Sequence, residues 1–564
     1  MSTGRSNASS NASTAEVTPV IEAAIARLRH CSQRDLRGGW RGIEADLPLR
    51  DALDPQHWLS WVPVPLNAKG HVSWTSGKQV LWLGQAIAVP NTLPANNGYP
   101  VNGLTLRLAL RWWAEEAQVY VDGRLSQEGD IFDCFGRVLL HPSVEPGQNI
   151  HVALRLVSPG HDAGALVQSL ALFEQPNASP DVFPQASPEP SPELGLEPGF
   201  IADEMAVLLR VLQHCDPDQL PVMAQALGRI PWDEVSNRPR FDAALAQIRQ
   251  TLQPLGELVT QRQITLLGHA HLDLAWLWPI AETWGVAERT FESVLQLQDC
   301  FPELVFTHST PALYAWIEAH RPALFRRICD RVQSGQWEIA AGLWVEPELT
   351  YVGGESIARQ VLYGQRYTQE RFGQHNRVAW LPDSFGFCGQ LPQILRQGGI
   401  DYFASQKLRW NDTTTFPHEW FRWQSPDGSA VLGVNLPPIG TDIDPVQMAS
   451  HLCDWETATG HQTALWLPGV GDHGGGPTAD MLEQVRRWQR SPFFPQLAFG
   501  PVYGFLDQIP RDDIPTWTQD LYLEFHRGCY TTHPDQKRWN RRCERQLYEA
   551  ELFAALATIT VSSP

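Results

Sequence analysis

Chemically useful side chains follow three short apolar runs in the second half of the chain. His271 and Asp273 come after residues 264–267, Asp383 comes after 378–381, and Asp472 comes after 464–467. Residues two apart in an extended segment project from the same side, so His271 and Asp273 can face one cation. Imidazole nitrogens and carboxylate oxygens are ordinary zinc ligands. Because two carboxylates beside a sugar can act as nucleophile and general acid/base, the pattern indicates metal-assisted carbohydrate hydrolysis.

Each of these motifs also has an ordinary structural explanation. A His-x-Asp triplet occurs by chance in many proteins. Asp383 could cap a helix, but the next helix is expected to begin near Gln390, which leaves Asp383 in a loop. The glycine-rich segment 469–476 lacks the Lys-Ser/Thr of a phosphate-binding loop. We interpret it as a loop that a substrate can approach closely, with Asp472 available and His473 either a partner or merely exposed.

A repeated strand–loop–helix pattern positions these residues. Strands are predicted at 264–267, 304–307, 337–341, 378–381, 402–405 and 464–467, and helices at 279–297, 312–332, 354–372, 390–398 and 479–487. A hairpin is predicted around Asp427-Gly428. Six or seven such units in a row mean parallel strands joined by helical crossovers. We therefore expect a (β/α)7-type barrel catalytic domain at 262–515. In such folds the catalytic residues lie in the loops that follow the carboxyl ends of the strands, which is where these side chains occur.

The remaining segments have different compositions. We expect a disordered leader and short helix at 1–50, an all-β sandwich of galactose-binding type at 51–174, a Pro-rich linker at 175–199, a helical segment at 200–261, and the first part of a helical bundle at 516–564. Within the first segment, the polar leader is expected at 1–15 and the helix at 16–30. The sandwich could bind sugar, although a docking or structural role is at least as well favoured.

Composition excludes several classes of protein. A net charge of −19 argues against nucleic acid as a partner. Nine scattered cysteines without a Cys-x-x-Cys argue against a disulfide scaffold or zinc knuckle, so reduced thiols in a cytoplasm are expected. The N-terminus lacks the pattern of a signal peptide, and no apolar run is long enough to cross a membrane. The sequence therefore predicts a cytoplasmic protein without a membrane partner.

The motifs also carry a family resemblance. They occur in family order within 262–557, at Gly268–Pro279, Trp344–Glu346, Trp380–Gly386, Ser405–Lys407, Gly471–Thr478 and Tyr530–His533. With them the chain resembles the glycoside hydrolase family 38 α-mannosidases, and among these the cytosolic type. The preceding sandwich and linker also match the layout of that type.

The resemblance implies a retaining hydrolase that releases terminal α-linked mannose from oligosaccharides. His271, Asp273 and Asp383 would bind one zinc ion, and Asp383 would also be the nucleophile. Asp472 would be the general acid/base. The zinc ion would hold the 2- and 3-hydroxyls of the sugar, although cobalt or manganese could occupy a site with these ligands.

Three further residues are implied to contact the substrate or the nucleophile. Trp276 would stack on the mannose ring, and Lys407 would lie beside the nucleophile. His473, next to the acid/base, would contact the substrate.

One departure from the family concerns the fourth zinc ligand. The family takes it from a His-Asp motif on a later helix, and this chain ends at Pro564 before any equivalent. We therefore expect a three-ligand zinc site of lower affinity. We also expect the last helix to expose an apolar face at Leu547, Leu552, Phe553 and Leu556.

Alternatives to a self-sufficient mannosidase follow from this departure. The chain could be a catalytically impaired remnant that binds carbohydrate. It could instead be half of a split enzyme, with a second polypeptide supplying the missing histidine, or act as a homo-oligomer. A zinc deacetylase acting on polysaccharide also places Asp and His at strand ends, but the order and spacing of the motifs argue against it.

Overall fold

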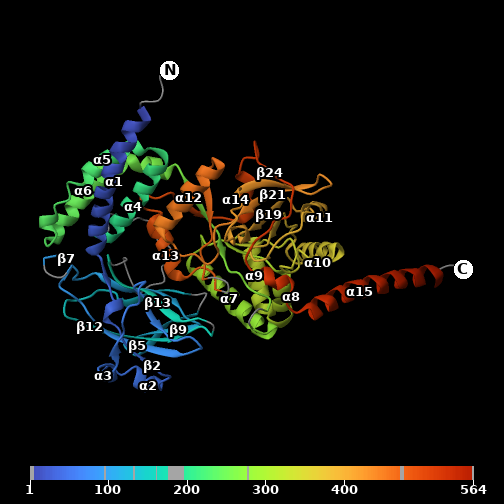
Figure 1. The fold of residues 1–564 in the computed structure, drawn as a ribbon, viewed down its shortest axis with the longest axis horizontal. Coiled ribbons are helices and arrows are strands. Elements are labelled where there is room, and N and C mark those ends of the chain that lie inside the picture. The colour runs from blue at the N-terminus through green and yellow to red at the C-terminus, as the bar shows by residue number, and fades with distance from the viewer. Residues whose placement is uncertain are drawn as a thin grey trace. The chain divides into compact units, whose positions relative to one another are not determined.

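The computed structural model describes residues 6–94, 97–130, 134–160, 162–175, 196–275, 278–470 and 475–561. The chain divides into two compact units (Figure 1). Unit 1 contains Met1–Ile264, Asp442–Cys453 and Ala479–Leu497. Unit 2 contains Thr265–Thr441, Asp454–Thr478 and Ala498–Pro564. The domain limits expected at 50, 174, 199, 261 and 515 stay predictions.

The β-rich part of unit 1 contains two antiparallel sheets, as the alternating sequence predicts. The first has the order β1-β13-β8-β11, with β4 on β13, and the second the order β10-β9-β12-β5-β2-β3. The strands are β1 (Gln33–Asp35), β2 (Arg41–Glu44), β3 (Val62–Pro63), β4 (Val72–Trp74), β5 (Val80–Ala88), β8 (Thr105–Trp113), β9 (Glu116–Val121), β10 (Arg124–Asp130), β11 (Phe135–His141), β12 (Asn149–Val157) and β13 (Gly164–Glu174). Buried residues alternate with partly exposed ones along β8 and β13, because successive side chains point to opposite faces.

Unit 1 also contains helices. Its longer ones include α1 (Ser6–His30), α4 (Pro198–Cys215), α5 (Leu220–Leu227), α6 (Arg238–Thr260) and α13 (Ala479–Trp488). The expected leader is corrected for residues 6–15, since α1 already begins at Ser6. Ile21, Ile25 and Leu28 are buried in the later turns of α1. Once these turns are formed, each further residue that is fixed adds one hydrogen bond without a new nucleation cost, which favours a longer helix.

A buried ion pair joins two of these helices. Glu204 on α4 has no exposed side-chain surface, and its two oxygens accept hydrogen bonds from Arg249 on α6 at 2.7 and 2.8 Å. Ser491 also donates to this carboxylate, at 2.5 Å. A carboxylate without exposed surface depends on such partners, because burying an unpaired charge is strongly unfavourable.

Replacing Arg249 with methionine should therefore destabilise unit 1 by about 3–5 kcal/mol, because it leaves the Glu204 carboxylate buried without its cation. The free energy of unfolding from a urea titration measures the change. Arg240→Met is the matched control on the same helix, since its side chain is largely exposed and lies 3.8 Å from Glu234. An equal loss of stability in both variants would contradict the prediction.

Unit 2 follows the strand–helix alternation that the sequence predicts. Its strands include β15 (Gly268–His269), β16 (Phe306–His308), β17 (Trp337–Ile339), β18 (Val378–Trp380), β19 (Tyr402–Ser405), β20 (Trp420–Gln424), β21 (Ala430–Asn435), β22 (Thr463–Trp466) and β24 (Thr516–Trp517). Its helices include α7 (Ile280–Cys300), α8 (Pro311–His320), α9 (Pro322–Gln333), α10 (Gly354–Phe372), α11 (Leu391–Gln397) and α14 (Val502–Gln508). The helix expected over 312–332 is instead two helices, because Pro322 lacks an N–H and Arg321 before it leaves the helical conformation.

Parallel pairing dominates these strands. β15, β16 and β17 form one sheet in that order, and β18, β19 and β21 are neighbouring parallel strands of a second. The expected hairpin at Asp427-Gly428 joins β20 to β21 in antiparallel fashion. A further sheet has the order β22-β14-β23, with β14 at Gln263–Leu266 and β23 at Gln496–Phe499. The strands thus fall into separate sheets within the described residues, and the closed (β/α)7 barrel stays a prediction.

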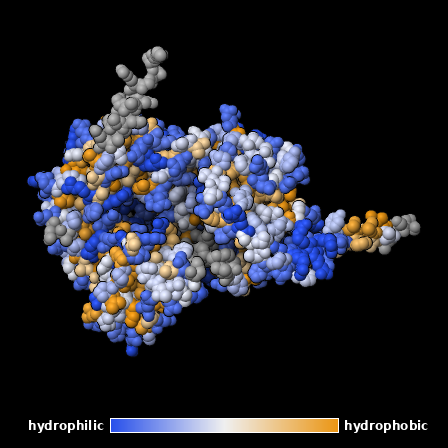
Figure 2. All heavy atoms as spheres, in the orientation of Figure 1, coloured by the Kyte–Doolittle hydropathy of each residue, from blue (hydrophilic) through white to orange (hydrophobic). Residues whose placement is uncertain are grey.

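The last helix, α15 (Pro534–Val561), carries the exposed apolar residues that the sequence predicts. Leu547 and Phe553 are each 66% exposed, and Leu552 and Leu556 are also exposed. Figure 2 shows a hydrophilic surface over the first half of α15 and a hydrophobic one over its second half. The remaining helices of the expected bundle are not part of the described chain. Within the described ranges, every helix is too short or too polar to span a lipid bilayer.

Candidate active site

Three strand ends of unit 2 supply the candidate site. His271 and Asp273 follow β15, Asp383 follows β18, and Lys407 follows β19. Since β18 and β19 are parallel neighbours, the segments that follow them leave the sheet at the same edge. The site is therefore built from loops at the carboxyl ends of strands.

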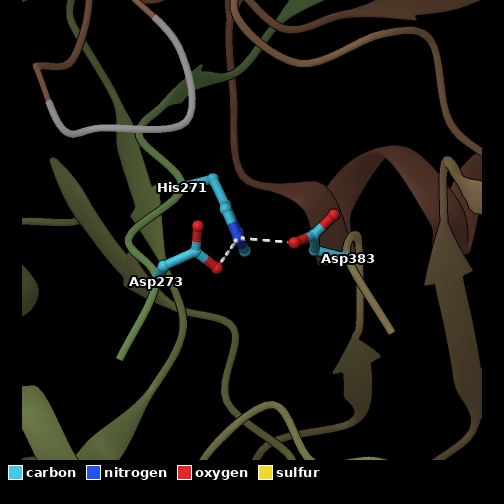
Figure 3. A group of neighbouring side chains, drawn as sticks. All are labelled: His271, Asp273 and Asp383. Atoms are coloured by element: carbon cyan, nitrogen blue, oxygen red, sulfur yellow. Dashed lines mark ion pairs between the residues drawn. The ribbon is translucent and has the colours of Figure 1, made fainter. Parts of the chain in front are cut away.

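The imidazole of His271 lies between two carboxylates (Figure 3). Its Nε2 is 3.4 Å from Oδ1 of Asp273 and 3.5 Å from Oδ2 of Asp383. One ligand atom from each of the three residues lies within 4.8 Å of the other two, which is a spacing that one metal ion can bridge. The structure thus brings together the three side chains that the sequence suggests as metal ligands.

The charges of this cluster fit a bound cation. His271 is buried, and its Nε2 has no hydrogen-bond partner among the described residues. Burial alone would lower the pKa of His271, but Asp273, Asp383 and Glu346 together raise it well above its usual value. A divalent cation between these groups would satisfy the unpartnered nitrogen and the carboxylates together. The donor set of one imidazole and two carboxylates therefore fits a metal ion such as zinc.

Lys407 holds the other side of Asp383. Its side chain is 1% exposed, and its Nζ makes an ion pair with Oδ1 of Asp383. The ammonium also lies over the rings of Trp410, at 3.1 Å, and Phe385, at 4.7 Å. Burial raises the pKa of Asp383, but the stronger combined effect of His271 and Lys407 lowers it to about 2. Asp383 is thus an ionised carboxylate that cations hold from two sides.

Glu346 is a site residue to which sequence reasoning assigned no role. Its Oε1 accepts hydrogen bonds from the backbone N–H groups of Asp383, at 2.5 Å, and Ser384, at 2.8 Å. Its Oε2 is 3.8 Å from Nδ1 of His271, and burial raises the pKa of Glu346 to about 7. Glu346 therefore positions the loop that carries Asp383. The sequence signal that could have identified Glu346 is its position as an acidic residue in the loop after the predicted strand 337–341, which is β17 in the structure.

Three expected site residues lie outside the described part of the chain. They are Trp276, Asp472 and His473. Their roles in stacking, acid/base catalysis and substrate contact stay predictions.

Fold and site together define a candidate metal-binding α/β enzyme, and sequence comparison identifies its family. Residues 261–521 match the family described as "Glycosyl hydrolases family 38 N-terminal domain", and residues 524–563 match the "Alpha mannosidase middle domain". Over residues 261–563, the chain belongs to glycoside hydrolase family 38.

Named relatives agree with this family. The chain is 36% identical to "Alpha-mannosidase" of Saccharomyces cerevisiae over 58% of its length and 31% of the relative's. It is 36% identical to "Alpha-mannosidase G" of Dictyostelium discoideum over 54% of its length and 28% of the relative's. It is also 36% identical to "Alpha-mannosidase 2C1" of Homo sapiens over 53% of its length and 29% of the relative's. The matched part spans about a third of the length of these curated relatives.

Proposed function

We propose that this chain carries the catalytic residues of a retaining α-mannosidase that hydrolyses terminal α-linked mannose in oligosaccharides. The observation that supports this most directly is the placement of Asp383. It is ionised, held by Lys407 and adjacent to His271, as a carboxylate nucleophile requires. The names of the relatives support the choice of mannose.

The proposed reaction has two displacements. An oxygen of Asp383 attacks the anomeric carbon, while the bond to the leaving oxygen breaks and Asp472 donates a proton to that oxygen. In the second step Asp472 takes a proton from water, the water oxygen bonds to the anomeric carbon, and the carboxylate of Asp383 is released. Because each displacement inverts the anomeric centre, the product keeps the α configuration. Glu346 and Lys407 hold Asp383 in place through both steps.

His271, Asp273 and Asp383 would hold the metal ion, and zinc suits this donor set, with cobalt or manganese as substitutes. When bound, a divalent ion supplies Lewis-acid binding of sugar hydroxyls. Trp276 would stack on the mannose ring, and His473 would contact the substrate. A cytoplasmic location and a partner chain or homo-oligomer also stay proposals.

The test is hydrolysis of 4-nitrophenyl α-mannoside by the purified chain, measured beside its metal content. Proton NMR of the first-formed sugar should show α-mannose, and the β-mannoside should not be hydrolysed. Bound metal without any turnover would favour the alternative, a carbohydrate-binding remnant or half of a split enzyme. A β-mannose product would contradict the retaining mechanism.

Replacing Lys407 with methionine should lower kcat/KM by roughly 10²- to 10³-fold, because it removes the buried cation that stabilises the Asp383 carboxylate. Steady-state kinetics with 4-nitrophenyl α-mannoside measures the change. Lys69→Met, at an exposed position in unit 1, is the matched control. Unchanged kinetics in Lys407→Met would show that the ion pair has no part in catalysis.

A further inference from the structure

An open cavity of about 560 Å³ lies in unit 2, outside the cluster around His271. Thr350 and Tyr351 contribute from the loop between β17 and α10, Tyr530 contributes from the end of helix η5 (Arg527–Tyr530), and α15 contributes Lys537, Arg538 and Arg541. The volume is within the range of small-molecule sites. Three cations and two aromatic rings in one cavity are notable in a chain whose net charge is −19.

The cavity adjoins the loop that carries Asp383. Gly386 has a φ of +121°, and a side-chain carbon there would lie 2.9 Å from Oη of Tyr530 and 3.1 Å from Cγ2 of Thr350. Glycine is thus needed at this position both for its backbone conformation and for the close approach of the cavity wall. Since Gly386 is three residues from Asp383, their Cα atoms are at most about 11 Å apart. Two residues of the cavity wall, Thr350 and Tyr530, therefore pack against the loop that carries Asp383.

The Glu346–Tyr351 segment connects the two places as well. At one end, Glu346 accepts the backbone hydrogen bonds of Asp383 and Ser384. At the other end, Thr350 and Tyr351 line the cavity. The same short segment thus supports the candidate site at one end and lines the cavity at the other.

The cations of the cavity differ in how far they are neutralised. Arg541 makes an ion pair with Glu544 at 2.6 Å. Lys537 donates to the carbonyl oxygen of Thr532 and lies 5.7 Å from the ring of Tyr351. Neither Lys537 nor Arg538 has a carboxylate partner within the described chain.

Glu348 is a carboxylate whose charge acts on both tyrosines of the cavity. Its Oε1 accepts hydrogen bonds from the backbone N–H and the hydroxyl of Thr350. The pKa values of Tyr351 and Tyr530 are raised by the burial of these tyrosines and by the negative charge of Glu348. With Arg541 neutralised by Glu544, the charges of Lys537 and Arg538 outweigh that of Glu348. The cavity is therefore net positive and suited to an anionic oxygen group.

We propose that this cavity binds a carboxylate or phosphate group on the leaving-group side of the substrate, so that the enzyme prefers α-mannosides whose leaving group is anionic. The inference rests on the proposed mannosidase function for its assignment to the leaving group. The cavity's ability to bind an anion beside a mannoside can be measured without turnover.

The experiment compares three ligands that resist hydrolysis: phenyl, 4-carboxyphenyl and 4-phosphooxyphenyl α-thiomannoside. Calorimetry with the metal-loaded chain should give roughly tenfold tighter binding of an anionic ligand than of the phenyl ligand. The carboxylate and phosphate arms show which anion is preferred. The preference should shrink as salt is raised, because the cations are exposed.

The double variant Lys537→Gln/Arg538→Gln should lose this preference. Arg545→Gln should keep it, since Arg545 lies on the same helix outside the cavity and 3.5 Å from Glu549. Equal binding of all three ligands by the unaltered chain, or a preference that survives the double variant, would overturn the inference. Hydrolysis of 4-nitrophenyl α-mannoside, assayed in parallel, separates the two claims. A preference for the anionic ligands without hydrolysis would contradict only the mannosidase proposal. Hydrolysis without such a preference would contradict only the proposed anion site.

Discussion

Asp383→Asn should abolish hydrolysis of 4-nitrophenyl α-mannoside, with kcat lower by at least about 10⁴-fold. The amide is almost the same size as the carboxylate but is a poor nucleophile, and it cannot pair with Lys407. Initial rates at saturating substrate measure the effect, and the metal content of the variant is measured with them. Asp512→Asn, at an exposed position of unit 2, is the matched control and should retain full activity.

A second variant tests the nucleophile through the configuration of the product. Asp383→Ala opens space for a small anion, so added azide should attack the anomeric carbon from the face that the carboxylate used. Because only one displacement then occurs, the product should be β-mannosyl azide. Formation of α-mannosyl azide, or full activity in Asp383→Asn, would exclude Asp383 as the nucleophile.

His271→Ala should lower metal affinity by more than about 100-fold. Loss of a residue that merely orients a ligand typically costs 10- to 100-fold, and His271 is the central donor, within 3.5 Å of both carboxylates. We expect about one metal ion per unaltered chain and almost none in the variant after dialysis, by elemental analysis. Hydrolysis should fall in parallel, and a chelator should have the same effect on the unaltered chain.

His375→Ala is the control for this experiment, because His375 is an exposed histidine of unit 2. Its metal content and activity should match those of the unaltered chain. If His271→Ala retained its metal, the ion would be bound elsewhere. Activity that persists after complete metal removal would contradict a metal-dependent mechanism.

Much of the α/β organisation could be predicted from the sequence because its signals are local. The predicted helix 354–372 and strand 402–405 have the same limits as α10 and β19. Strand and helix periodicities depend on near neighbours, and both segments satisfy them without long-range help. The helix expected over 312–332 was wrong at Pro322, where proline outweighed a continuous apolar periodicity.

The sequence by itself determined which residues follow strand ends, and hence His271, Asp273 and Asp383 as candidates, while Lys407 was implied by the family resemblance. Only the tertiary structure decided that these loops meet, that Lys407 is buried against Asp383, and that Glu346 holds the same loop. The cavity beside Gly386 likewise requires α15, some 150 residues further along the chain, to lie against the Asp383 loop. The physical reason is that periodicity and spacing act over a few residues, whereas distances between loops are set by how parallel strands pair and pack.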